Sequence, residues 1–154
     1  MSKQQVILSE NLNESLKQAI EACPHDKLFV LADECTARLC LTLIQEFDYL
    51  ANAEYITIGA TDTHKTLETL AHVWKELGDK GGTRHSLMLN VGGGMVTDLG
   101  GFADSTFKRG IAYINIPTTL LAMVDASVGG KTGINFNGLK NEVGVFSPAR
   151  SVLI

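Results

Sequence analysis

The chain has 154 residues, of which 45% are hydrophobic and 19% charged, and its formal net charge at pH 7 is −4. This length and composition are typical of one soluble globular domain that buries its own core. The negative charge argues against a general nucleic-acid-binding protein, because phosphate neutralisation needs a basic face. No apolar run reaches the ~20 residues of a membrane span, and the N-terminus lacks the apolar stretch of a signal peptide. The cysteines Cys23, Cys35 and Cys40 fit no zinc spacing, so we expect reduced thiols in a cytoplasmic protein.

Strands and helices alternate in the sequence pattern up to Pro117. Short β-branched or apolar runs predict strands, and apolar residues at helical spacing predict the helices between them. This alternation predicts an α/β domain with a mostly parallel sheet and helices on both faces. The expected strands are an edge strand at 6–8, a buried strand at 28–31, and strands at 55–58, 87–91 and 111–116. Between the first three strands we expect a helix that carries Leu12, Leu16, Ala19 and Ile20 and that Pro24 stops, and then a helix with Leu39, Leu43 and Ile44 on its apolar face. After the strand at 55–58 we expect a helix that ends at Gly78 and has Leu67, Leu70, Ala71, Trp74 and Leu77 on one face, and after the strand at 87–91 a helix from about 95 to 107.

After Pro117 the pattern changes, because short apolar pieces are broken by glycines and no long helix is expected. Glycines are unevenly spread, since 11 of the 15 lie beyond residue 90. The first half is therefore typical of a scaffold and the second half of a site. The apolar run at 152–154 resembles the middle of a strand, so we expect the chain to be an excised domain.

Three consecutive glycines, Gly92 to Gly94, follow a predicted strand and precede a helix that carries Asp98. Glycines at this place allow positive φ angles and a close approach of a ligand to the backbone. The helix start offers free N–H groups to a phosphate. Thr97 stands where the third glycine of the dinucleotide pattern belongs. Two interpretations therefore stay open, a phosphate-binding turn and a tight structural turn.

A second segment, Asp125 to Thr132, nearly matches the P-loop pattern. Asp125 stands at the position of the first glycine, where a carboxylate would face the phosphate. Gly133 and Gly138 interrupt the helix that should follow, so we reject a Walker site. Lys131 among these glycines still presents a positive charge and flexible backbone donors to an anion.

Further polar residues lie in this glycine-rich region: the cations Arg109, Lys131 and Lys140, the amide Asn141 and the carboxylate Asp125. Such a set suits a small, polyanionic, hydroxylated substrate. Each cation alone is also consistent with a solvated surface position, and periodicity does not decide between the two.

Two threonines, Thr118 and Thr119, follow the strand that ends at Pro117. Their hydroxyls can bond a ribose or a nicotinamide amide, and they can equally cap the turn that follows. The four histidines do not have metal-binding spacing, and we expect no metal site within the chain.

The run from Gly92 to Pro148 resembles the 3-dehydroquinate synthases of the shikimate pathway, and the earlier βα units resemble them more loosely. The motifs occur in one order: the triple glycine with an aspartate four residues after its last member, R-G at 109–110, P-T-T-L-L at 117–121, V-D-x-S-V-G-G-K-T at 124–132 and K-N at 140–141. The resemblance implies that residues 1–154 are a Rossmann-like N-terminal domain that binds NAD. In the family a helical domain with a divalent metal, Zn or Co, follows. The resemblance also implies a homodimer with a sugar phosphate substrate, whereas the charge and the apolar runs predict no role for nucleic acid or membrane.

The resemblance implies a role for particular residues of this chain. For the cofactor these are Asp33 near the adenosine ribose, Asp62 and Lys65, then Gly93, Gly94, Met95 and Asp98 at the pyrophosphate and ribose, Thr118 and Thr119 on the nicotinamide side, and Lys131 and Lys140. For the substrate they are Asp125, Lys131, Lys140 and Asn141 at the junction with the cofactor, and Arg109, which reaches the substrate phosphate from the partner subunit. No complete catalytic set and none of the family's metal ligands, one glutamate and two histidines, is implied within the chain.

The sequence departs from the family pattern at a few positions. Asp62 stands where glutamate is usual, Thr61 and Thr97 stand where glycine is usual, and residues 137–141 read N-G-L-K-N where P-L-G-K-N is usual.

The implied reaction converts 3-deoxy-D-arabino-heptulosonate 7-phosphate to 3-dehydroquinate and phosphate. It runs through transient oxidation by NAD, elimination of phosphate, re-reduction and an intramolecular aldol step. We expect the 154-residue domain by itself to bind NAD weakly at most and to be inactive, because catalysis depends on positioning many groups at once. Two alternatives stay open, another sugar-phosphate cyclase and a stand-alone nucleotide-binding module.

Overall fold

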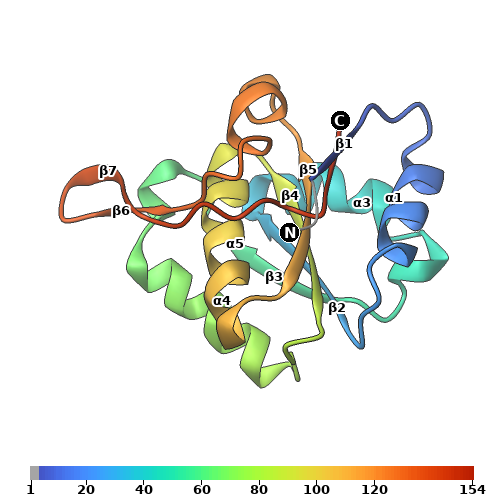
Figure 1. Cartoon of the computed structure of the whole chain (residues 1–154), viewed down its shortest axis with the longest axis horizontal. Coiled ribbons are helices and arrows are strands. Elements are labelled where there is room, and N and C mark those ends of the chain that lie inside the picture. The colour runs from blue at the N-terminus through green and yellow to red at the C-terminus, as the bar shows by residue number, and fades with distance from the viewer. Residues whose placement is uncertain (1–3) are drawn as a thin grey trace.

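The computed structural model describes residues 4–154, and its main sheet has six strands in which every neighbouring pair is parallel (Figure 1). The strand order is β1-β8-β5-β4-β2-β3. The strands are β1 (Gln5–Ile7), β2 (Leu28–Asp33), β3 (Glu54–Ile58), β4 (Leu87–Gly92), β5 (Ala112–Pro117) and β8 (Ser151–Leu153). The prediction of a Rossmann-like α/β domain with a mostly parallel sheet is confirmed, and the expected edge strand near residue 6 is β1.

Helices cover both faces of the sheet, as predicted. The longer helices are α1 (Leu12–Glu21), α4 (Leu67–Asp79) and α5 (Gly94–Thr106). Because successive residues of a strand point to opposite faces, Phe29 and Leu31 of β2 pack with α4 and α5, while Val30 packs with α1 and the helical segment that follows β2. Both faces of the central strands are therefore buried, which explains their continuous apolar runs.

The helical segment after β2 differs from the prediction. It consists of α2 (Glu34–Thr36), a π-helical turn η1 (Ala37–Leu41) and α3 (Thr42–Ile44), with a 3-10 turn η2 (Asp48–Leu50) after it. Ile44 is buried as expected, but Leu39 and Leu43 are 61% and 70% exposed, and Leu41 is buried instead. The prediction of Leu39 and Leu43 as core residues is wrong because a π-helical turn holds more residues than an α-helical one, so side chains leave the α-helical spacing.

Helix α4 buries Leu70 and Leu77, as predicted, together with Val73, while Leu67 and Ala71 are exposed. The apolar stripe is therefore narrower than the prediction and is centred on Val73. The helix also runs past Gly78 to Asp79.

Helix α4 is followed by a glycine turn, in which Gly81, two residues after Asp79, has a φ angle of 83°. The N–H of Gly82 donates to the Leu77 carbonyl at 2.7 Å, and the N–H of Gly81 donates to the Gly78 carbonyl at 3.2 Å. This pair of bonds is a Schellman motif, in which glycine takes the left-handed position just after the last helical residues. The prediction of Gly78 as the stop is wrong because Gly78 lies inside that final turn.

The segment after β5 contains no long helix, as predicted. It holds a π-helical turn, η5 (Ala122–Ala126), and an antiparallel hairpin made of β6 (Ile134–Phe136) and β7 (Leu139–Val143), before the chain returns to the sheet as β8. Asn137 and Gly138 form the two-residue turn of the hairpin with φ angles of 52° and 77°. Two successive positive φ angles are typical of a type I′ turn.

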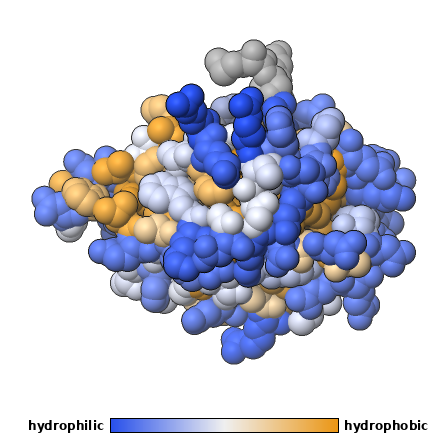
Figure 2. Space-filling view, turned by 90° about the horizontal axis from the view of Figure 1, so that it is seen from below, coloured by the Kyte–Doolittle hydropathy of each residue, from blue (hydrophilic) through white to orange (hydrophobic). Residues whose placement is uncertain are grey.

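The hairpin extends from one end of the molecule (Figure 1). Phe136 and Leu139, on either side of its turn, are 48% and 54% exposed. Figure 2 shows hydrophobic residues gathered at this end of the surface. The hairpin therefore gains little of its stability from burial.

The order of the strands creates a topological switch point between β2 and β4. The chain leaves β2 toward β3 on one side and leaves β4 toward β5 on the other. Ligands of doubly wound sheets bind outside the carboxyl ends of the strands at such a point. Asp33 and Gly92 end the two strands that flank it. Among the described residues, no helix is long and apolar enough to cross a membrane.

Candidate functional site

The glycine turn connects β4 to α5 at the switch point. Helix α5 begins with Gly93 at the N-cap position, and glycine has no side chain that could cap the first turn. The N–H groups of that turn are therefore available to an anion, and the positive end of the helix dipole lies there. Within residues 4–154 the glycines with positive φ angles are Gly81, Gly110, Gly130 and Gly138.

The expectation of positive φ angles in the glycine turn is therefore wrong, and space is the reason for glycine there. A Cβ atom on Gly92 would lie 2.6 Å from Cγ2 of Val96, and one on Gly93 would lie 3.1 Å from Cγ2 of Thr119. Thr97 fits where the family usually has glycine, because its hydroxyl donates to the carbonyls of Gly93 and Gly94 at 3.3 Å each.

A buried cation ties this helix to two other segments. This cation is Lys65, which comes directly after the 3-10 turn η3 (Asp62–His64) and is only 4% exposed. Its Nζ donates to Oδ2 of Asp98 at 2.8 Å and also to Oδ1 of Asn141. The first turns of α5, the 62–65 segment and the β6–β7 hairpin therefore meet at one ammonium group.

Asp98 is the charged partner in this cluster. Burial raises the pKa of its carboxyl, the Lys65 ammonium opposes that rise without cancelling it, and the nearby carboxylates of Asp125 and Asp62 add to it. A carboxylate that is held by lysine but surrounded by other acids suits a site that exchanges hydrogen bonds with a hydroxylated ligand.

An open cavity of about 430 Å³ lies next to the cluster. It is lined by three carboxylates from α5, η5 and β7, a lysine from the glycine-rich loop and an amide from β7. These residues are Asp98, Asp125, Glu142, Lys131 and Asn141, joined by Thr132, Gly133, Gly144, Val145 and Phe146. The structure thus brings together four of the residues that the sequence predicts for the site, from parts of the chain that lie more than 40 residues apart at the extremes.

A second cavity of about 270 Å³ lies at the carboxyl ends of β4, β5 and β8. Its wall is mostly apolar and includes Val91, just before the glycine turn, and Thr118, just after β5. The other lining residues are Ser9, Leu12, Cys40, Leu43, Ile44, Ile116, Pro117, Leu153 and Ile154. Its apolar lining suits a flat, largely apolar ring.

The two threonines after β5 have local partners. The hydroxyl oxygen of Thr119 accepts from the N–H of Ala122 at 3.2 Å, so the capping interpretation holds for Thr119. The N–H of Thr118 donates to the carbonyl of Gly92 at 2.9 Å, which fixes this residue beside the glycine turn. Both therefore lie where β4 and β5 end.

Asp33, Met95 and Lys140 lie around the two cavities without lining them. Asp33 caps the helical segment after β2, since its Oδ1 accepts from the N–H of Thr36 at 2.7 Å. Met95 is half-buried in the first turn of α5. Lys140 lies on the exposed strand β7, next to Asn141.

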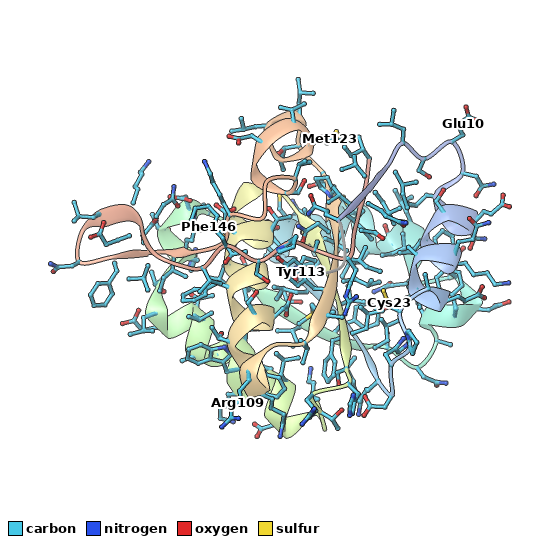
Figure 3. All side chains as sticks on the ribbon, in the orientation of Figure 1. Glu10, Cys23, Arg109, Tyr113, Met123 and Phe146 are labelled. Carbon is cyan, nitrogen blue, oxygen red and sulfur yellow. The ribbon has the colours of Figure 1, made fainter. Side chains whose placement is uncertain are left out.

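Arg109 is not brought to the site within one chain. It lies beyond the opposite end of α5, in the 3-10 turn η4 (Phe107–Arg109), and Figure 3 shows it at the lower edge of the molecule, well below Phe146, which lines the larger cavity. Arg109 has a φ angle of 71° and Lys108 one of 48°. These left-handed residues form an exposed corner between α5 and β5.

The sequence analysis did not single out Asn135 or Glu142, which the structure places at the site. Asn135 bonds to Asp62 and Asn141, and Glu142 lines the larger cavity. The signal that could have located both is the pair Asn137-Gly138, which predicts a hairpin turn and would have set the two strands side by side.

In the part of the chain that the structure describes, no group of three or more histidine, cysteine, aspartate or glutamate residues could hold a metal ion. The donor set of the larger cavity is a mixture of carboxylates, a lysine and an amide. A lysine in the same cavity does not suit a cation site, so we assign no metal chemistry to these residues.

Comparison with known proteins places the chain in a family. The model of the N-terminal region of 3-dehydroquinate synthase matches residues 55–154. The chain belongs to the 3-dehydroquinate synthase family. The 3-dehydroquinate synthase of Parabacteroides distasonis is 49% identical over 154 residues, which are all of this chain and 44% of that protein. The chain thus spans less than half the length of this 3-dehydroquinate synthase.

Solved structures agree with the family assignment. The structure of 2-deoxy-scyllo-inosose synthase complexed with carbaglucose-6-phosphate, NAD+ and Co2+ is similar to this chain with a TM-score of 0.87 and 27% identity, over 99% of this chain and 42% of that one. The 2-epi-5-epi-valiolone synthase of Streptomyces hygroscopicus, with NAD+ and Zn2+ bound, has a TM-score of 0.86 and 31% identity, over 100% of this chain and 43% of that one. The fold of this 3-dehydroquinate synthase family member is thus shared with sugar-phosphate cyclases.

Proposed function

We propose that residues 1–154 form the NAD-binding N-terminal part of a 3-dehydroquinate synthase. The observation that carries this proposal is the cluster of Lys65, Asp98 and Asn141, which joins the first turns of α5 to the wall of the larger cavity. Family membership and the topological switch point support it independently.

The residues at the carboxyl edge fit a dinucleotide. The free N–H groups at the start of α5 suit a pyrophosphate, and Gly93 leaves room for it next to Thr119. The apolar cavity suits the adenine ring, which would place Thr118 at the adenine end and not on the nicotinamide side that the resemblance implies, and the larger cavity suits the nicotinamide end. We propose that the other predicted cofactor residues contact the same dinucleotide from around the two cavities; they include Asp33, Asp62 and Met95.

Reversible hydride transfer is the chemistry that NAD would supply in such a site. The residues of this chain would bind and orient the substrate beside it. Lys131 and Asn141 line the cavity and Lys140 flanks it, so they present positive charge and an amide to a phosphorylated, hydroxylated ring. Asp125 would accept hydrogen bonds from its hydroxyls, and Asp98 would accept them from the ribose of the cofactor.

Arg109 would act between subunits. Its corner lies away from the two cavities described above, and a left-handed turn exposes it beyond the end of α5. We propose a homodimer in which Arg109 reaches the substrate phosphate in the cleft of a second copy. Sedimentation of the whole protein tests the dimer, and Arg109→Ala should weaken substrate binding without changing NAD+ affinity.

The substrate that we propose is 3-deoxy-D-arabino-heptulosonate 7-phosphate, and the products are 3-dehydroquinate and phosphate. The 49% identity to a named 3-dehydroquinate synthase favours this reaction. The likeness to cyclases that act on other sugar phosphates makes a different cyclase the second candidate. Since the chain spans 44% of its relative, we propose that it does not turn over by itself and works within a longer protein.

Calorimetric titration of the chain with NAD+ tests the cofactor. Lys65→Met keeps most of the side-chain volume but leaves the buried Asp98 without its cation, so affinity should fall at least about tenfold. The matched control is Lys75→Met, since Lys75 is exposed on α4 and pairs with nearby Asp79. Binding that is the same in both variants would refute the assigned cofactor site.

Phosphate release by the whole protein tests the reaction. The three substrates to compare are 3-deoxy-D-arabino-heptulosonate 7-phosphate, sedoheptulose 7-phosphate and glucose 6-phosphate. Release from the first alone supports a 3-dehydroquinate synthase, and release from either of the others supports another cyclase. NAD+ binding with no release from any of them supports a nucleotide-binding module.

A further inference from the structure

Asn135, in the middle of β6, is bonded to two other segments through its backbone and both ends of its side-chain amide. Its N–H donates to the carbonyl of Lys65 at 2.8 Å. Its Nδ2 donates to Oδ2 of Asp62 at 3.1 Å and to the carbonyl of Asp62 at 3.3 Å. Its Oδ1 accepts from the N–H of Asn141 at 3.0 Å. One side chain therefore links the 62–65 segment to the far strand of the hairpin.

Asn141 depends on such local support. Its φ angle of 53° lies in the left-handed region, which asparagine tolerates but does not prefer over extended backbone. The strand β7 that carries it is exposed along its whole length, so packing contributes little to its position. Polar contacts are therefore what fixes the place of this strand.

The contacts form a closed ring. From Asp62 the ring passes through Asn135 to Asn141, and the Oδ1 of Asn141 accepts from Nζ of Lys65, which belongs to the same segment as Asp62. Lys65 also holds Asp98 on α5. Without the Asn135 amide the ring opens, and Asn141 keeps the bond from Lys65 and the pairing of β7 with β6 on either side of it.

We propose that Asn135 is the positioning residue that fastens the β6–β7 hairpin to the 62–65 segment and orients Asn141 at the cavity. The consequence for ligands rests on the function proposed above: Lys140 and Asn141 reach the cofactor and substrate only while this fastening holds. Asn135 itself does not line the cavity formed by the described residues. It acts through Asn141 and is not a catalytic residue.

The test measures how fast the amide proton of Asn141 exchanges with water, by NMR of the full chain. Asn135→Ala removes the acceptor, so exchange should become at least about tenfold faster. Asn135→Asp keeps an acceptor but sets its carboxylate against that of Asp62, so exchange should also accelerate. The double variant Asp62→Asn/Asn135→Asp exchanges donor and acceptor, so protection should return. The matched control is Asn137→Gly, because glycine adopts the positive φ angle of that turn position.

A purely structural role would not give the recovery in the double variant. The same exchange rate in Asn135→Ala and the wild type overturns the inference, and so does a double variant that stays as fast as Asn135→Asp. NAD+ titration of Asn135→Ala is the second measurement, and affinity should fall several-fold while the free energy of unfolding stays within experimental error. Absence of NAD+ binding by the whole protein would refute the proposed function, and the exchange rates would still decide the role of Asn135.

Discussion

The buried acid Asp104 gives the sharpest test of how the core is built. Its side chain lies in α5 with 0% exposure, and one oxygen accepts from Nδ2 of Asn90 at 3.0 Å. Its other oxygen, Oδ1, has no hydrogen-bond partner within residues 4–154. Burial raises the pKa of this carboxyl well above its ordinary value, and the bond from Asn90 opposes the rise only in part.

The change to make is Asp104→Asn, which keeps an acceptor for Asn90 and removes the titration. Since the pKa of Asp104 is raised in the fold, the folded chain keeps a proton that the unfolded chain releases above a pKa of about 3.9. The contribution of this carboxyl to stability is therefore fully present below that pH and is lost as the pH rises toward the folded pKa. In this window the wild type should lose about 1.4 kcal/mol per pH unit relative to Asp104→Asn.

Urea unfolding at a series of pH values from about 4 to about 8 measures this difference. Trp74 is the only tryptophan and serves as the probe, because its Nε1 donates to Oγ1 of Thr106 at 3.0 Å across the contact between α4 and α5. Asp104→Ala should show the same pH slope as Asp104→Asn with a lower overall stability, because it also loses the bond from Asn90. Parallel pH dependence in the wild type and both variants, or a wild type that gains on them as the pH rises, would refute the reasoning.

Two further changes follow from the packing. A Cβ atom on Gly100 would lie 2.4 Å from Oδ1 of Asn90, so Gly100→Ala should lower the free energy of unfolding by about 1–3 kcal/mol. A Cβ atom on Gly78 in α4 would meet nothing within 4 Å, so Gly78→Ala should raise the free energy of unfolding by up to about 1 kcal/mol. Thermal unfolding compares the two variants, and equal effects would contradict the packing. Asp33→Ala removes a capping box and should cost about 1 kcal/mol, while Asp33→Asn should cost clearly less because its amide oxygen can still cap; the same measurement decides, and equal losses would contradict the capping role.

The sheet and its layers were predictable because burial imposes a period on the sequence. Strands buried on both faces read as continuous apolar runs, such as 28–31, and the order of elements then predicts the parallel sheet. The segment after β2 was mispredicted because its π-helical turn abandons the α-helical period on which the prediction of Leu39 and Leu43 rested. The residue types in this segment do not predict a π-helical turn.

The site was predictable only where its chemistry is local. The glycine turn was predictable because its residues are adjacent in the sequence, although its glycines are needed for close packing and not for positive φ angles. The bonds of Lys65 to Asp98 and Asn141 span 33 and 76 residues, and no local pattern contains such pairs. Motif resemblance supplied the residues, and only the three-dimensional structure shows that one ammonium group joins them.

The buried polar residues on the inner strands do not line the site, but their hydrogen bonds connect the core to it. Asn90 and Asn115 lie on neighbouring strands, where Nδ2 of Asn90 donates to Oδ1 of Asn115 at 3.1 Å, and Nδ2 of Asn115 donates to the carbonyl of Ser127 at 3.2 Å. With Asp104 these amides form a buried chain from α5 through β4 and β5 to the end of η5. Because an unpaired polar group in the core is costly, this chain holds the turn that follows Asp125 in one place. The core thereby positions one wall of the cavity, which an apolar core of the same shape would leave to loop contacts alone.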